Sequence, residues 1–232
     1  MAIFTPGAVI GQISGRVGGY VFSRNRGGSY VRNGSVPSTV VTEKALLYKS
    51  YLAAASQYWS SLTDAQRLSW TVWAQSKTST NRLGRSISLN GQNWFVSLNS
   101  RLAAAGEDMI VVPPVTSSPV GVAISAFAVD AGAGATQVTF TPAPLAANEK
   151  LWVRGAMVSS SAINNVENLL TTVTITAAAA ASPLDLKSPL ADAFGAVAVG
   201  ATYVIECRVL DTKNGMVSGR SFARTVAVST AP

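Results

Sequence analysis

The stretch that decides the fold is Tyr203-Val204-Ile205-Glu206-Cys207-Arg208-Val209-Leu210. Its β-branched and aromatic residues favour an extended strand. The segment that follows, Asp211–Gly215, ends in the Asn-Gly pair that tight hairpin turns prefer. Cys207 is the only cysteine, which excludes an internal disulfide and a cluster of thiolate metal ligands. Among these apolar neighbours we expect Cys207 to be a small buried side chain.

Further runs of β-type residues lie on either side of this strand, separated by turn residues. They are Gln137–Phe140, Leu151–Arg154, Thr171–Ile175 and Ala223–Val228. Roughly seven short strands in a segment of this length is the pattern of an immunoglobulin-like sandwich. We therefore expect residues 120–232 to form an all-β sandwich, with Phe140, Trp152 and Tyr203 largely buried in its core.

Residues 42–110 have helical periodicity and predict a module of short helices. Apolar residues of the first helix recur at the i, i+4, i+7 and i+8 positions of one face; they are Leu47, Tyr51, Ala54, Ala55, Tyr58 and Leu62. Thr63 and Gln66 have the spacing of a capping box at the start of a second helix. A third helix is predicted from near Asn90 to Gly106, because glycine commonly ends a helix.

Four of the five tryptophans fall in this helical module, at positions 59, 70, 73 and 94. Because these positions keep the helical phase, we expect them to form a compact aromatic core for the three helices. The alternative is an exposed platform on which bases or a ligand would stack.

Residues 1–41 form a third zone, which holds eight of the 19 glycines and no acidic residue. Two β-prone runs, Tyr20–Arg24 and Ser29–Arg32, flank a Gly-containing loop, which predicts a hairpin. Because a two-stranded hairpin is marginal alone in water, we expect it to dock on the helices of its own chain or on another chain. The candidate interaction residues are Arg16, Tyr20, Phe22, Arg24, Arg26, Tyr30 and Arg32.

Two other interpretations of this basic zone stay open. Arginines interleaved with aromatic rings could instead bind nucleic acid, with phosphates on the arginines and bases on the rings. The third possibility is a solvated face. The density of glycines favours close backbone contact with a neighbouring subunit whose carboxylates pair with the arginines.

Charge is distributed unequally along the chain. Eleven Lys and Arg residues precede residue 111 against four Asp and Glu, whereas the remaining residues have seven of each sign. Such asymmetry predicts two modules with different roles. The boundary is expected in residues 111–119, a Pro- and Ser-rich linker. Only 12% of the residues are charged, which is typical of a surface that other chains cover.

Composition also excludes most catalytic chemistry. The chain has no histidine, which removes Ser-His-Asp and Cys-His catalysis and the common zinc sites. The glycines at 11–19 are not followed by the Lys of a phosphate loop, and Gly132-Ala133-Gly134 lacks the third glycine of a dinucleotide site. We expect no enzyme activity, no cofactor and no metal. No signal peptide or membrane span is recognisable, so we expect a soluble protein made in the cytoplasm.

Part of the second half resembles a fibronectin type III domain. The segments similar to its strands B, C and F are Gln137–Pro144, the strand around Trp152, and Gly200–Asp211. By this resemblance Tyr203 corresponds to the corner tyrosine. Phe140 stands where that family usually has tryptophan. The resemblance covers about half of the chain and implies a sandwich fold.

The first half resembles a group of tailed-phage and prophage proteins. The similar segments are Ser14–Arg24, Trp59–Trp70 and Leu89–Phe95. The resemblance implies a virion component, located in the virion after synthesis in the host cytoplasm, with no catalytic residues to transfer.

These observations predict an α+β multidomain protein: a basic Gly-rich β-hairpin over 1–41, a helical module over 42–110, a linker over 111–119 and a sandwich over 120–232. The expected function is that of a non-enzymatic structural protein of a bacteriophage virion, as head decoration or cement, or as another head or tail component. The expected partners are other virion proteins and further copies of the same chain, with no membrane. The alternatives are a host-recognition module that binds a cell-surface glycan or protein, and a DNA-binding accessory protein.

Overall fold

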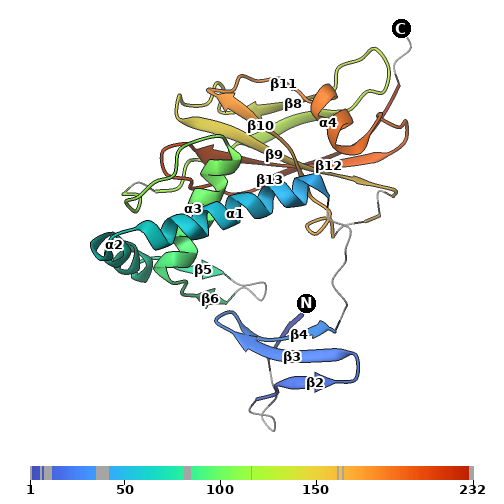
Figure 1. The fold of residues 1–232 in the computed structure, drawn as a ribbon. Helices are drawn as coiled ribbons and strands as arrows, with labels where there is room; N and C mark the ends of the chain where they lie inside the picture. Colours follow the sequence, from blue (N-terminus) through green and yellow to red (C-terminus); the bar gives the residue numbers. More distant parts are fainter. Residues whose placement is uncertain are drawn as a thin grey trace. The chain divides into compact units, whose positions relative to one another are not determined.

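The computed structural model describes every residue except 1, 6, 8–11, 35–41, 81–84, 116, 161, 164 and 230–232. It divides into two compact units, Met1–Pro113 and Pro114–Pro232 (Figure 1). Within the described residues there are four helices and thirteen strands, and the strands form four antiparallel sheets. The expected mixed α+β fold is therefore present.

The first sheet lies at the start of the chain and has the strand order β1-β4-β3-β2. Its strands are β1 (Ala2–Phe4), β2 (Gly15–Val17), β3 (Tyr20–Asn25) and β4 (Gly28–Asn33). The predicted hairpin is β3 and β4, in which Asn25 faces Gly28 across the turn. The expectation of only two strands is wrong, because β1 pairs with β4 and β2 pairs with β3. Gly18 turns the chain back between β2 and β3 with a φ of 58°, which glycine adopts at little cost.

Three helices and a small hairpin make up the rest of the first unit. The helices are α1 (Glu43–Ser61), α2 (Asp64–Gln75) and α3 (Gly91–Ala104), and α3 packs against both of the others. Side chains of Thr42, Thr63 and Asn90 accept backbone hydrogen bonds at the three N-termini. The capping box of Thr63 and Gln66 is confirmed. The strands β5 (Ser79–Thr80) and β6 (Ser86–Ile87) pair between α2 and α3 and were not anticipated.

The predicted apolar face of α1 is confirmed only in part: Tyr51, Ala55 and Leu62 are at least partly covered, whereas the other three predicted residues are exposed. Ala55 is the only fully buried residue within the helix, whereas Leu47 is 50% exposed and Tyr58 is 37% exposed. The helical residues that are at least partly covered form a face rotated by about one residue from the predicted one. They are Ala45, Tyr48, Tyr51, Ala55 and Trp59. Leucines also lie on other sides of α1, so its apolar pattern does not select one face.

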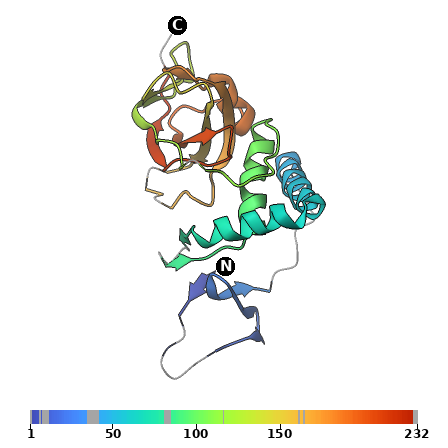
Figure 2. The ribbon, with the colours of Figure 1, turned by 90° about the vertical axis from the view of Figure 1, so that its left-hand side faces the viewer.

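The second unit consists of two sheets that enclose one hydrophobic core (Figures 1 and 2). The four-stranded sheet has the order β10-β9-β12-β13, with β9 (Glu149–Val158), β10 (Thr171–Ala178), β12 (Thr202–Asp211) and β13 (Ser221–Val226). The three-stranded sheet has the order β11-β8-β7, with β7 (Ala123–Ala128), β8 (Gln137–Thr141) and β11 (Leu184–Asp185). A short helix, α4 (Lys187–Phe194), joins β11 to β12 and was not predicted.

The core of this unit takes alternate residues from the long strands. Val138 and Phe140 of β8, Leu151 and Val153 of β9, and Ile205, Cys207 and Val209 of β12 are all 0–1% exposed. Phe140 and Tyr203 are buried as expected, at 1% each. The expectation for Trp152 is wrong: it is only half-buried, because it lies between Leu151 and Val153 and points to the opposite face of β9.

Tyr203 differs from a corner tyrosine in its polar contacts. Its ring packs edge-on against Phe194 of α4, at 6.3 Å between centroids. Its buried hydroxyl has no hydrogen-bond partner within the part of the chain that the structure describes. A corner tyrosine uses this hydroxyl to bind the backbone, so Tyr203 here serves the core through its ring.

Candidate functional site

The structure divides the seven predicted interaction residues between the two faces of the first sheet. Cross-strand partners share a face, and the register places Phe22 opposite Val31 and Arg16 opposite Val21. Tyr20, Phe22 and Arg24 therefore lie on one face, and Arg16, Tyr30 and Arg32 lie on the other, while Arg26 is in the β3–β4 turn. The sheet does not bring the seven residues together in one site.

Both faces of this sheet are partly apolar. Phe4 and Phe22 meet edge to face at 5.9 Å on one side, beside Val31, and Ile3 and Tyr30 are neighbours on the other. None of the described side chains of the sheet is fully buried, and Val17 and Tyr20 are 66% and 58% exposed. Antiparallel sheets commonly leave one polar face in water, so apolar residues on both faces leave apolar surface that another chain could cover.

Residues 59–70 contain the end of α1, the turn that follows it and the first half of α2. Arg67 donates through Nη2 to the carbonyl of Ser60 at 2.7 Å and through Nη1 to Asp64 at 3.2 Å. It thereby satisfies a free carbonyl at the end of α1, while Thr63 caps α2. These polar residues have structural partners, so the segment serves helix packing.

The tryptophans of the helical module form the expected aromatic cluster. Trp70 and Phe95 are completely buried, and their ring centroids are 5.3 Å apart. Trp59 packs on Phe95 at 5.2 Å, and Trp73 lies 5.6 Å from Trp94. Because the rings contact one another, the cluster is a core and not a row of open stacking surfaces.

Two buried side chains of the module fix the segment at 110–111, which the sequence assigns in part to the linker. Asn99 is fully buried and holds Ile110 twice: its Oδ1 accepts from the backbone N–H at 2.7 Å and its Nδ2 donates to the carbonyl at 3.2 Å. The indole N–H of Trp70 donates to the carbonyl of Val111 at 2.7 Å. Residue 111 is thus attached to the helices.

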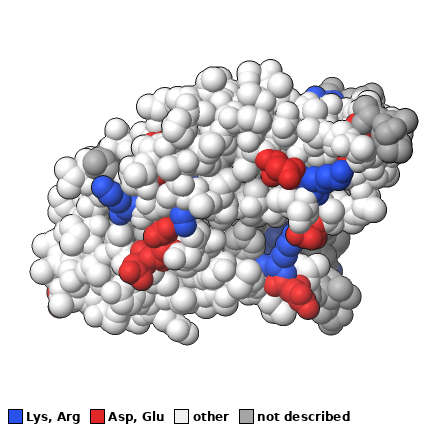
Figure 3. Space-filling view, turned by 90° about the horizontal axis from the view of Figure 1, so that it is seen from above, with Lys and Arg blue, Asp and Glu red and all other residues white. Residues whose placement is uncertain are grey.

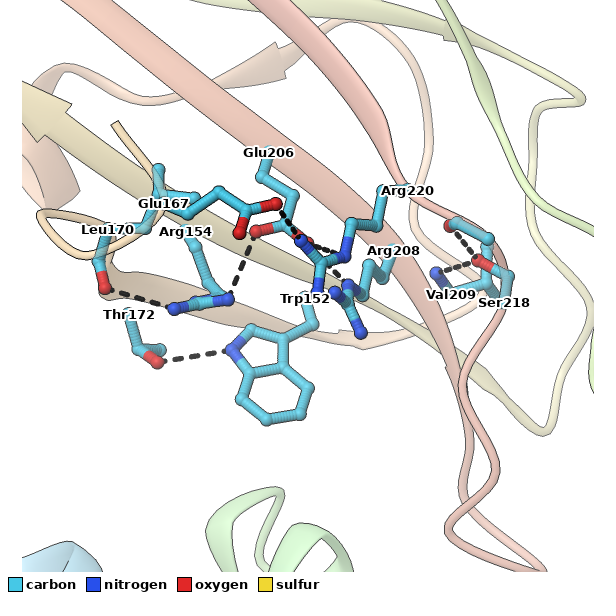
Figure 4. A network of polar contacts seen from close by, with 11 residues as sticks. Trp152, Arg154, Glu167, Leu170, Thr172, Glu206, Arg208, Val209, Ser218 and Arg220 are labelled. Carbon is cyan, nitrogen blue, oxygen red and sulfur yellow. Dashed lines mark hydrogen bonds and ion pairs between the residues drawn. The ribbon is translucent and has the colours of Figure 1, made fainter. Parts of the chain in front are cut away.

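The second unit contains a polar cluster that the sequence analysis did not identify (Figure 4). Glu206 of β12 is completely buried, and its carboxylate accepts from Arg154 of β9 at 3.0 Å and from Arg208 at 2.5 Å. Arg220, before β13, lies 3.6 Å from Glu206 and pairs with Glu167 at 2.7 Å. A buried carboxylate is tolerated only with such partners. The available signal was the alternation of Glu206 and Arg208 within an otherwise apolar strand.

The remaining contacts of this cluster involve the connection from β9 to β10. Arg154 donates through its other terminal nitrogen to the carbonyl of Leu170 at 3.1 Å, and the indole of Trp152 donates to Thr172 at 3.1 Å. Arg208 uses only Nε, and its two terminal nitrogens have no partner among the described residues. The terminal nitrogens of Arg208 are therefore available to a further acceptor.

The chemistry available elsewhere is limited. Burial, with the nearby charge of Glu206, raises the pKa of the Cys207 thiol to about 12, so it is a neutral thiol in the core. The described residues contain no group of three or more His, Cys, Asp or Glu side chains placed to hold a metal ion. Of the helices described, none has the length and hydropathy to cross a membrane. On the face shown in Figure 3, charged side chains form a few small groups on an uncharged surface.

Comparisons of the chain with protein families, with curated proteins and with solved structures found no match.

Proposed function

We propose that this chain is a non-enzymatic structural protein of a tailed-phage particle, anchored by its N-terminal half. The observation that carries the proposal is the first sheet, β1 to β4, whose apolar residues lie on both faces while none of its described side chains is fully buried. Its arginines have no acidic residue within residues 1–41 to pair with. An assembly partner supplies both the missing cover and the missing carboxylates. Decoration of the head surface is the preferred position, and a tail or head–tail position is the alternative.

The roles of the phage-like residues support a structural function. Thr63, Arg67, Trp70 and Phe95 cap, connect or fill the helical module. Gly91 lies where α3 meets α2, and a Cβ there would be 2.8 Å from the backbone of Trp70. Each of these residues is used for packing, and none of these contacts suggests catalysis.

We also propose an immunoglobulin-like sandwich of the fibronectin type III kind for the second unit. Seven strands in a four-stranded and a three-stranded antiparallel sheet around one core support this assignment. The helix α4 and the unpartnered hydroxyl of Tyr203 are departures from that family. In the particle this unit projects from the anchor.

Deletion of residues 1–34 tests the anchoring role. We expect the truncated chain to keep the second unit folded and to be missing from particles purified from the phage or prophage that encodes it. Copies per particle would be counted by quantitative mass spectrometry against the full chain. A matched variant with Arg16, Arg24, Arg26 and Arg32 changed to Gln keeps the sheet and separates the contribution of charge from that of apolar contact.

Two outcomes contradict this function. If the truncated chain enters particles at the normal copy number, the anchor lies elsewhere in the chain. If assembly is normal but the Gln variant loses a DNA-binding activity that weakens steeply with salt, the basic sheet is a nucleic-acid contact instead.

A further inference from the structure

One face of the β10-β9-β12-β13 sheet carries most of the basic residues of the second unit. The strand register places Trp152 opposite Arg208, Arg154 opposite Glu206, and Glu206 opposite Phe222, all on the side away from the core. Residues 111–232 contain seven basic and seven acidic residues, all of which the structure describes. Five of the basic ones lie on this face or beside it: Lys150, Arg154, Arg208, Arg220 and Arg224.

Only two of the seven acidic residues, Glu167 and Glu206, lie in the same region. Both are already paired with arginines of the face. A unit that is neutral overall is therefore basic on this side, with a net charge of +3 from these seven groups. The positive charge on this side favours the approach of an anionic partner.

Arg208 is the residue best placed to bind that charge. Its Nε is held by the buried Glu206, which fixes the direction of the guanidinium. Its side chain is 18% exposed, and both terminal nitrogens are without a partner among the described residues. Two parallel N–H donors on one planar group match the two oxygens of a carboxylate. Figure 4 shows the indole of Trp152 beside this arginine.

The surroundings of Arg208 indicate what kind of molecule carries the carboxylate. On the same face, Phe222 is 44% exposed and Val226 is 46% exposed, at alternate positions of β13. Exposed aromatic and aliphatic side chains next to arginine are the composition of protein interfaces, in which Trp, Phe and Arg are enriched and Lys is depleted. A nucleic acid would need a more continuous positive surface, and here Glu167 is 64% exposed between the arginines.

We propose that this face is a docking surface for an acidic segment of another protein. A carboxylate of the segment binds the terminal nitrogens of Arg208, and apolar side chains of the segment cover Trp152 and Phe222. This inference is independent of the anchoring role of the first sheet. It gives the chain a second contact, so that the projecting second unit binds a partner of its own.

The test is a titration of the full chain with a short synthetic peptide in which glutamates alternate with leucines. We expect the indole N–H resonance of Trp152 and the guanidinium resonance of Arg208 to shift on binding, with a Kd at or below about 1 mM. The matched peptide with glutamines in place of glutamates should bind at least about tenfold more weakly, because it lacks the charge-assisted bonds.

Two variants of the protein complete the experiment. Arg208→Lys keeps a positive charge next to Glu206 but removes the two parallel donors of the guanidinium. It should weaken binding of the glutamate peptide about tenfold and change the melting temperature by no more than a few degrees. Lys213→Ala removes a charge from the exposed β12–β13 turn and should leave binding unchanged. If Arg208→Lys strongly lowers the melting temperature, the comparison of the glutamate and glutamine peptides on the wild-type chain still tests whether binding depends on carboxylates.

The proposal is overturned if the glutamate peptide shifts neither resonance, or if the glutamine peptide binds as well. It is also overturned if single-stranded DNA or an acidic trisaccharide shifts the Trp152 and Arg208 resonances while the glutamate peptide does not. In the last case the face binds a different class of molecule.

Discussion

At the scale of single residues, two buried polar side chains, Glu206 and Asn99, have partners that are distant in the sequence. Glu206 is separated by 52 residues from Arg154, and Asn99 by 11 residues from Ile110. An unpaired buried charge or amide is costly, so each of these groups depends on its partner being in place. Such residues connect elements of the fold and give little sign of doing so in the sequence.

Cys207 is predicted to be unreactive in the native protein. Burial raises its pKa to about 12, so near pH 8 it stays protonated and inaccessible, and only the thiolate is nucleophilic. Iodoacetamide at pH 8 should leave the native chain unmodified and alkylate it fully in guanidinium chloride, as measured by intact mass. Rapid modification of the native chain would contradict the burial of this thiol.

Gly91→Ala is predicted to destabilise the helical module. A Cβ at this position would lie 2.8 Å from the carbonyl carbon of Trp70 and 2.8 Å from the amide nitrogen of Thr71, both of which are backbone atoms. Overpacking of this kind typically costs about 1–3 kcal/mol of unfolding free energy. The measurement is urea unfolding of the full chain, followed by circular dichroism at 222 nm.

The control for this variant is Gly219→Ala. Nothing lies within 4 Å of a Cβ built at Gly219 and its φ is not positive, so the unfolding free energy should change by less than about 0.5 kcal/mol. Equal effects of the two substitutions would mean that α2 and α3 do not approach as closely as the structure shows.

At the scale of secondary structure, β9 shows how alternation separates two roles within one strand. Leu151 and Val153 are fully buried in the core, while Trp152 and Arg154 lie on the other side in the polar cluster. The aromatic residue of the strand is thus on the surface side, and the smaller aliphatic residues make the core.

Alanine substitutions of the aromatic residues in β8 and β9 are predicted to lower the unfolding free energy by unequal amounts. Phe140→Ala removes a ring that is 1% exposed and should lower the unfolding free energy by about 3–5 kcal/mol. Trp152→Ala removes a half-buried ring and one hydrogen bond to Thr172, and should cost about 1–2 kcal/mol. Chemical denaturation of both variants gives the comparison, and a larger loss for Trp152→Ala would place its ring in the core after all.

At the scale of the whole molecule, the two units differ in how they bury apolar surface. The core of the second unit is built entirely from residues between Val122 and Ala227 and includes both of its sheets. The first unit has a small aromatic core among its helices, and none of the described side chains of its sheet is fully buried. The core of the second unit is therefore formed within that unit, whereas the sheet of the first unit leaves its described apolar side chains at least partly exposed.

Residues 114–232 are predicted to fold as an isolated fragment. The fragment retains every residue of its core, so it should show a β-type circular dichroism spectrum and one cooperative thermal transition. A helical spectrum, or gradual unfolding without a transition, would show that the second unit depends on the first.

The sequence by itself determined the features that depend on neighbouring residues. The capping box of Thr63 and Gln66, the start of α3 at Asn90, the β3–β4 hairpin and the strands β8, β9 and β12 were all predicted, because caps, turns and β-propensity act over a few residues. The switch from helical to strand periodicity was likewise visible before the structure was known.

Only the tertiary structure decided which sides of these elements are covered and which distant residues meet. Leucines occur around α1, so its buried face depends on where α3 packs. The strand containing Trp152 has apolar residues in both alternating sets, Leu151 and Val153 in one and Trp152 in the other, so its inward side depends on its pairing with β12. The joining of Glu206 to Arg154, and of β1 to β4, requires closure of long loops, and the free energy of those contacts lies in non-local packing that no local pattern encodes. The contact of β2 with β3, in contrast, is made by the short turn at Gly18.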